Sequence, residues 1–288
     1  MAEWSDGYWW SNDGLRLHYR DYAGPAERPP IVCIPGLTRN ARDFEGVADR
    51  LAGELRVICV ELRGRGDSAY AKDSMSYVPL TYLQDMEALI RELALDRFVL
   101  FGTSLGGLIT MLLAASDQKR IAAALLNDIG PELEPSGLER IRGYVGKQQS
   151  WPTWLHAARF LREAQNDRYP DWDIDQWLVY AKRLCKLTPA GRIVFDYDSR
   201  LAEPFKVPGG ETGFDLWPAF KGLNGVPSLV VHGELSDLLS AATVERMKEI
   251  NPAMESVTVP RVGYAPTLDE PEAQAAIDRL LKRIESGA

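Results

Sequence analysis

A serine in the middle of a G-x-S-x-G pattern carries the strongest chemical signal in this chain of 288 residues. Ser104 lies between Gly102 and Gly106, directly after the apolar run Phe98–Phe101 and directly before an apolar segment with helical spacing. A serine on a sharp strand-to-helix turn projects its hydroxyl outward, and the start of the helix favours developing negative charge. We therefore predict that Ser104 is a nucleophile that attacks carbonyl groups.

Two backbone amides are expected to stabilise the oxyanion that such an attack creates. The apolar run Ile31–Ile34 ends in a turn formed by Pro35 and Gly36, and Leu37 follows. The N–H of Leu37 and the N–H of Leu105, the residue after the serine, are the donors that this arrangement uses. Leu37 and Leu105 are therefore the predicted oxyanion hole.

An acidic residue is expected to follow a later strand. Residues 229–231 are apolar, and Asp237 follows them in a short loop. The chain order of serine, then acid, then base is the one found with this kind of serine turn. We predict Asp237 as the acid, with Asp128, which also follows an apolar run, as the second choice.

Short apolar runs and helical segments alternate along most of the chain. The predicted buried strands are residues 31–34, 57–60, 98–101, 122–126, 229–231 and 257–259. The predicted helices include residues 80–90, 105–115 and 272–284. This alternation indicates βαβ units, so we predict an α/β fold with a mostly parallel sheet and helices on both faces.

Residues 131–215 interrupt this alternation with helical stretches and prolines, and no buried-strand run is obvious. Their tryptophans are Trp151, Trp154, Trp172 and Trp177. We predict a helical cap insertion at residues 131–215 over an α/β core made of residues 1–130 and 216–288. The tryptophans either pack between cap and core or face a substrate, because ligand sites often lie between subdomains.

These motifs together resemble the α/β-hydrolase superfamily, in particular its bacterial esterase, lipase and epoxide-hydrolase-like branch with a helical cap. The stretches that carry the resemblance are residues 35–40, 62–68, 102–106, 127–131, 233–237 and 262–271. The resemblance implies a sheet of the eight-stranded type and a serine hydrolase that cleaves a carboxylic ester, thioester or lactone through an acyl-enzyme. Ser104 argues against epoxide hydrolase or dehalogenase chemistry, which uses an aspartate at this turn.

Tyr264 stands where that family carries its catalytic histidine. Free tyrosine has a pKa near ~10, and lowering it by about three units needs roughly 4 kcal/mol of selective stabilisation. We therefore expect the Tyr264 O–H to donate to Asp237, which leaves Ser104 without a base. Either the tyrosine is an inactivating substitution in a hydrolase, or the protein carries it naturally and does something other than ordinary ester hydrolysis.

Other candidates and functions remain open at this stage. His18 and His232 lie in strands and are interpreted as structural, although His232 is close in sequence to Asp237, while His156 in the cap could hang over the serine. A ligand-binding pseudo-enzyme would keep the pocket without chemistry. A non-hydrolytic lyase would use Ser104 and the tyrosine at the base position as acid–base partners.

The composition limits the classes of partner that this protein is expected to bind. The net charge is −8 and the basic residues form no long run, which argues against nucleic acid. The chain start does not resemble a signal peptide, and no run of ~18 apolar residues occurs, so we expect a cytoplasmic protein without a membrane span.

Cys33, Cys59 and Cys185 are expected to be buried thiols. No metal or cofactor is expected, and the predicted partner is a small, moderately apolar molecule. Residues 62–66 are interpreted as a loop near the site, or alternatively as a phosphate contact.

Overall fold

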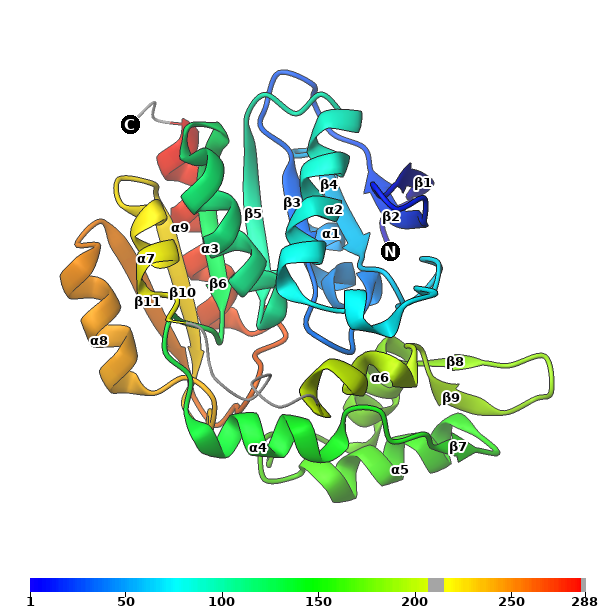
Figure 1. Ribbon diagram of the computed structural model, residues 1–288. Helices are drawn as coiled ribbons and strands as arrows, with labels where there is room; N and C mark the ends of the chain where they lie inside the picture. The colour runs from blue at the N-terminus through cyan, green and yellow to red at the C-terminus, as the bar shows by residue number, and fades with distance from the viewer. Residues whose placement is uncertain (207–214, 286–288) are drawn as a thin grey trace.

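The computed structural model describes residues 1–206 and 215–285, and within them an eight-stranded sheet forms the centre of the fold (Figure 1). Its strands are β1 (Ser5–Trp10), β2 (Arg16–Tyr22), β3 (Ile31–Ile34), β4 (Val57–Glu61), β5 (Phe98–Thr103), β6 (Ile121–Asn127), β10 (Ser228–Gly233) and β11 (Met254–Val259). Their order across the sheet is β1-β2-β4-β3-β5-β6-β10-β11. Only β2 pairs antiparallel, with β1 and β4, and the remaining pairs of this sheet are parallel. The predicted α/β class and mostly parallel sheet are confirmed.

Helices cover both faces of the sheet. They are α1 (Glu45–Leu51), α2 (Pro79–Glu92), α3 (Leu105–Asp117), α7 (Trp217–Phe220), α8 (Ala241–Ile250) and α9 (Pro271–Glu285). Because successive strand side chains point to opposite faces, Val32 packs in a core with α2 and α3, whereas Ile31 packs in a second core with α1 and α9. Cys33, Cys59 and Cys185 are buried and free, as expected.

The chain between β6 and α7 forms an insertion that lies beside the carboxyl ends of the parallel strands (Figure 1). Its helices are α4 (Pro135–Tyr144), α5 (Trp154–Gln165) and α6 (Ile174–Leu184). It also contains a small antiparallel sheet of β7 (Ser150–Trp151), β9 (Ile193–Phe195) and β8 (Cys185–Leu187). These strands were not predicted, because two or three residues are too few to display a period of two. Part of the predicted cap, residues 207–214, lies outside the described residues, and the cap boundaries stay a prediction.

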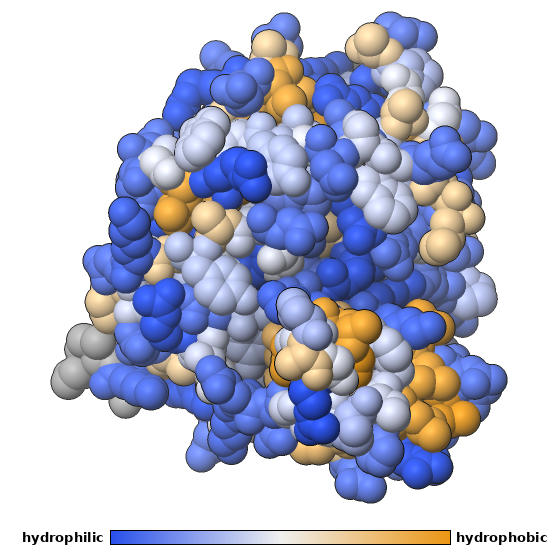
Figure 2. Space-filling view, turned by 90° about the vertical axis from the view of Figure 1, so that its right-hand side faces the viewer, coloured by the Kyte–Doolittle hydropathy of each residue, from blue (hydrophilic) through white to orange (hydrophobic). Residues whose placement is uncertain are grey.

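Aromatic side chains form much of the core of the insertion. Tyr169 stacks on Trp172 with ring centroids 4.0 Å apart, and Trp177 packs edge-on against both rings. Trp151 is also buried and Trp154 packs partly buried against the same core, so packing accounts for these tryptophans. Figure 2 shows a mostly hydrophilic face whose larger hydrophobic patches gather low in the view, where the insertion lies. Among the described residues, no helix combines the length and apolarity needed to cross a membrane.

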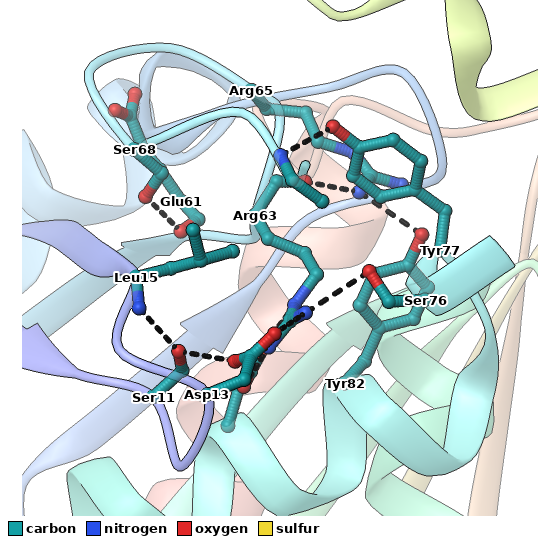
Figure 3. Close-up of polar contacts among 12 residues, drawn as sticks. Ser11, Asp13, Leu15, Glu61, Arg63, Arg65, Ser68, Ser76, Tyr77 and Tyr82 are labelled. Carbon is teal, nitrogen blue, oxygen red and sulfur yellow. Dashed lines mark hydrogen bonds and ion pairs between the residues drawn. The ribbon is translucent and has the colours of Figure 1, made fainter. Parts of the chain in front are cut away.

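Two buried arginines after β4 hold the loop that leads to the site (Figure 3). Arg63 forms ion pairs with Asp85 at 2.7 Å and with Asp13 at 2.8 Å. Arg65 donates hydrogen bonds to the carbonyls of Leu37 at 2.7 Å and of Arg63 at 2.6 Å. Both guanidinium groups are buried and so closed to a phosphate from solvent, although Arg65 Nη2 has no acceptor among the described residues.

Replacing Asp85 with alanine should destabilise the fold strongly. Both side chains of the Arg63–Asp85 pair are only 1% exposed, so the variant leaves a buried cation without its main partner. Breaking a buried pair in this way costs about 3–5 kcal/mol of unfolding free energy, which urea unfolding followed by circular dichroism will measure. Asp171→Ala is the matched control, because it opens an exposed pair with Arg261 and should hardly move the unfolding midpoint. Equal effects of the two variants would contradict the prediction.

Candidate active site

Ser104 lies on the turn between β5 and α3, where the sequence places it. Its φ of 52° and ψ of −115° form a conformation that residues other than glycine rarely adopt. The Ser104 N–H donates to the carbonyl of Asn127, at the end of β6, at 3.1 Å. Strained backbone of this kind clusters at functional sites. The local geometry is a strained strand-to-helix turn, with the serine directly before the first residue of the helix.

The glycines on either side of the serine allow close backbone contacts. A Cβ atom placed on Gly106 would lie 1.9 Å from the carbonyl oxygen of Ile34, on β3. A Cβ atom on Gly102 would lie 2.4 Å from the carbonyl oxygen of Gly106. No side chain fits at either position, which explains why the pattern needs small residues on both sides of Ser104.

The predicted oxyanion turn lies next to the serine. A Cβ atom on Gly36 would lie 3.6 Å from the Cβ atom of Ser104, so the turn after β3 and the elbow are in direct proximity. Arg65 fixes the turn by binding the Leu37 carbonyl. Leu105 is the first residue of α3, and the first N–H groups of a helix have no acceptor within it. The role of Leu37 and Leu105 as oxyanion donors stays a prediction that this arrangement suits.

Tyr264 lies against the serine hydroxyl, and its O–H donates a hydrogen bond to Ser104 Oγ. Burial, followed by the proximity of Tyr144, raises the pKa of the Tyr264 phenol well above its usual value. The Arg140 guanidinium lies over the ring, 5.0 Å from its centre, and opposes this shift without reversing it. At neutral pH the phenol is protonated, so it is a poor acceptor for the Ser104 proton.

Asp237 does not bind Tyr264 as expected, because it is engaged by an arginine of the insertion. Arg140, on α4, donates from Nε and Nη2 to the two carboxylate oxygens, the Nη2–Oδ1 distance being 2.6 Å. A bidentate guanidinium–carboxylate pair is stronger than a single hydrogen bond from a neutral phenol to the same carboxylate. Burial alone would raise the pKa of Asp237, but the hydrogen bonds and charge of Arg140 lower it below its usual value.

Asp128, the second-choice acid, is fully buried and fastens the loop that carries Asp237. Its carboxylate accepts a hydrogen bond from the Gly233 N–H at 2.9 Å and another from the Ser236 hydroxyl at 2.6 Å. Burial raises the pKa of Asp128 to about 7, although these two hydrogen bonds oppose the shift. Its contacts are those of a residue that positions the acid loop.

Two of the three histidines bind partners away from the serine. The exposed His156 lies 2.8 Å from the Thr153 hydroxyl at the start of α5, so it does not hang over the site. His232 Nε2 lies 2.9 Å from the carbonyl oxygen of Leu239, and burial lowers the pKa of this histidine. Neither side chain replaces the missing base.

The third histidine belongs to a polar network that joins β2 and β4. His18 lies 2.9 Å from Glu61 and 2.9 Å from Asp6 through its two ring nitrogens. His18, Glu61 and Asp67 bring potential metal-ligand atoms within 4.8 Å of one another. Both ring nitrogens are already hydrogen bonded, and the Asp67 N–H donates to Glu61, so the protein itself accounts for this cluster.

A cavity of about 300 Å³ lies between the core and the insertion. Thr103 and Asn127 line it from the core, and Leu161 and Tyr180 line it from the insertion. Tyr264 also forms part of its wall, whereas the serine does not, because the phenol lies on the serine hydroxyl. Of the described residues that line the cavity, none is a tryptophan.

Three residues around the site were not predicted from the sequence. Arg140 pairs with Asp237 across 97 positions of the chain, and no spacing rule signals such a contact. Tyr169 and Asn127 hold the segment after the tyrosine, donating to carbonyls of residues 265–266 at 2.8 Å each. Only Asn127 lies within a recognised stretch, residues 127–131, which directly follows a predicted strand.

Comparison with known proteins gives consistent findings. Residues 31–277 match a family model described as the alpha/beta hydrolase family. The crystal structure of an alpha/beta hydrolase from Novosphingobium aromaticivorans is 61% identical, with a TM-score of 0.95, over 98% of this chain and 99% of that chain. A 3-hydroxybutyrate-oligomer hydrolase from Cupriavidus necator is 38% identical over 91% of each chain. A 2-(acetamidomethylene)succinate hydrolase from Mesorhizobium japonicum is 26% identical over 81% of this chain and 80% of the relative.

Asp128→Asn should remove a pH-dependent loss of stability. The pKa of Asp128 is about 7 in the folded protein, against 3.8 ordinarily. Between about pH 4 and pH 7 the folded protein therefore keeps a proton that the unfolded chain has lost, and stability falls as pH rises. The slope is about 1.4 kcal/mol per pH unit. Urea unfolding at pH 5 and pH 7 should show this decline reduced in the variant.

Asp237→Asn is the matched control for this titration. Because the pKa of Asp237 lies below its usual value, its contribution is present above its unfolded pKa and is lost as the pH falls. Because this loss falls below the usual pKa of 3.8, Asp237→Asn should leave the decline between pH 5 and pH 7 unchanged, whereas Asp128→Asn should reduce it. A decline from pH 5 to pH 7 that persists unchanged in Asp128→Asn would rule out Asp128 as its source.

Proposed function

The chain belongs to the alpha/beta hydrolase family, and we propose that its scaffold cleaves carboxylic esters, thioesters or lactones through an acyl-enzyme on Ser104. The observation that carries this proposal is the strained elbow that holds Ser104 beside Gly36 of the oxyanion turn. The Cupriavidus relative is named for hydrolysis of a 3-hydroxybutyrate oligomer, and oligomers of a hydroxy acid joined through its hydroxyl are esters.

In this mechanism Ser104 Oγ forms a bond to the carbonyl carbon while its proton moves to a base. The N–H groups of Leu37 and Leu105 stabilise the resulting oxyanion. The alcohol or thiol then leaves with a proton, and water cleaves the acyl-enzyme in a second step. A histidine at position 264 would complete the proton path, with Asp237, which Arg140 binds in this chain, as the acid that orients it.

Tyr264 makes the chain a slow hydrolase under this proposal. Its phenol stays protonated at neutral pH, so no group next to Ser104 accepts the serine proton efficiently. Loss of one member of a catalytic triad typically leaves about 10³–10⁴-fold acceleration over water, which comes from the oxyanion hole and substrate binding. We therefore expect weak turnover with an intact substrate pocket.

The direct contact of Tyr264 with Ser104 supports a second candidate function. A protonated phenol beside a serine hydroxyl can act as a proton donor, as a lyase-type reaction requires. That enzyme would lose its activity when the Tyr264 O–H is removed, whereas a hydrolase that lacks its base would not. A pseudo-enzyme would bind a ligand in the cavity and turn over nothing, even with histidine at position 264.

Tyr264→His should raise ester hydrolysis by about 10²–10⁴-fold, the usual contribution of a general base. The measurements are initial rates on a panel of short p-nitrophenyl esters and the rate at which a fluorophosphonate probe labels Ser104. Ser104→Ala, made in the original chain and in the Tyr264→His form, gives the rate without the nucleophile in each assay. Equal labelling of the original chain and the histidine form would show that no base is missing.

Two further variants separate the candidate acids and the candidate functions. In the histidine form, Asp237→Asn should remove most of the gained activity, and Asp128→Asn should remove less. In the original chain, Tyr264→Phe should leave slow ester hydrolysis at its low level. A loss of activity in Tyr264→Phe would instead favour the lyase-type reaction.

A further inference from the structure

The cavity beside Tyr264 is basic although the whole chain has a net charge of −8. The charged side chains that line it are Arg39, Asp43, Arg140, Lys147, Arg168 and Arg183. Five of these six are cations. A cleft lined by one sign of charge attracts ligands of the opposite sign.

Carboxylates balance three of the five cations. Arg140 binds Asp237, as described above, and Arg183 binds Asp269 at 2.9 Å. The third pair joins the two neighbours Arg39 and Asp43 of the cavity wall. These pairs leave the remaining two cations as the source of the positive charge.

Arg168 and Lys147 are the two remaining cations. Arg168 Nε lies 3.7 Å from a carboxylate oxygen of Asp167, beyond hydrogen-bond distance, and that carboxylate is 81% exposed and shared with water. Lys147 forms no ion pair within residues 1–206 and 215–285. Arg168 thus brings one largely buried positive charge to the cavity, and the exposed Lys147 adds a second, partly solvated one at its edge.

Buried N–H groups without an acceptor also support an anionic ligand in this cavity. Arg140 Nη1, Arg168 Nε and Arg183 Nε are buried and have no hydrogen-bond partner among the described residues, and all three residues line the cavity. Buried polar groups in folded proteins nearly always have a partner. Three guanidinium groups with an unused donor on one cavity therefore indicate a ligand that supplies oxygen acceptors.

Arg168 is the cation best placed to act on a substrate of the serine. Its carbonyl accepts the Gly263 N–H at 2.6 Å, and a Cβ atom on Gly263 would lie 2.8 Å from Arg168 Cβ. Arg168 thus packs on the residue directly before Tyr264, which itself touches Ser104. A group bound at Arg168 would lie in the cavity whose wall includes Tyr264, the residue in contact with Ser104.

We infer that the cavity selects substrates that carry a carboxylate, and that Arg168, assisted by Lys147, binds this carboxylate. The guanidinium fork matches a carboxylate in bidentate geometry. Apolar residues such as Phe160 and Leu161 line the same cavity and suit a short hydrocarbon segment between the carboxylate and the ester. This inference rests on the proposed ester hydrolysis for its catalytic part, while carboxylate binding can be tested without turnover.

The binding test uses the chain with Tyr264 in place. Calorimetry should show that pentanoate binds at least about 10-fold more tightly than 1-pentanol, and that added salt weakens pentanoate alone. Arg168→Gln should weaken pentanoate about 10- to 100-fold, Lys147→Gln should weaken it less, and Arg168→Lys should restore part of the loss. Arg159→Gln, on the exposed side of α5, is the matched control and should change nothing.

The turnover test uses the Tyr264→His form with monomethyl glutarate and dimethyl glutarate. The half ester should have the lower KM, and Arg168→Gln should raise this KM about 10- to 100-fold, more than it raises that of the diester. Equal affinity for pentanoate and 1-pentanol overturns the inference. So does a pentanoate affinity that neither Arg168→Gln nor Lys147→Gln changes. Failure to cleave either ester, with Arg168-dependent pentanoate binding intact, overturns the proposed hydrolysis and leaves the carboxylate site standing.

Discussion

Direct backbone contact between the serine turn and β3 is the constraint on which the rest of the site depends. A side chain on Gly106 would overlap the Ile34 carbonyl, so α3 starts directly against the strand that leads into the oxyanion turn. Ser104 adopts its positive φ at this crowded point. Because close-packed interiors leave little room for adjustment, the serine and Gly36 are fixed relative to each other before the insertion contributes anything.

Local sequence signals were sufficient for the parts of the fold that depend on neighbours in the chain. Apolar runs of four or five residues marked β3, β4, β5 and β6, because buried parallel strands are apolar on both faces. The elbow at Ser104 was predictable for the same reason, since its strand, glycines and helix lie within about twenty residues of one another. The raised pKa of Tyr264 also followed the expectation that burial disfavours a phenolate.

Contacts between distant segments were not predictable in this way. Asp237 was expected to face Tyr264, yet a guanidinium that reaches it from α4 offers a charged, bidentate partner that the phenol cannot equal. Arg140 lies in the segment with the weakest sequence pattern, so nothing marked it in advance. Tyr169 contacts the tyrosine segment from the same insertion. The insertion thus determines which residue binds Asp237, whereas the core alone determines the backbone geometry at Ser104.

The charge of the cavity illustrates why whole-chain properties do not determine a site. At an effective dielectric constant of about 20, two unit charges 4 Å apart interact by about 4 kcal/mol, whereas exposed charges beyond about 8 Å are largely screened at physiological salt. The net charge of −8 therefore acts on the outer surface, while a bound group responds to the few side chains that touch it. Those side chains come from positions as far apart as Arg39 and Arg183, and only folding brings them to one cavity. A surface that repels anions and a pocket that attracts them are thus compatible, because the surface charge acts over longer distances than the charges lining the pocket.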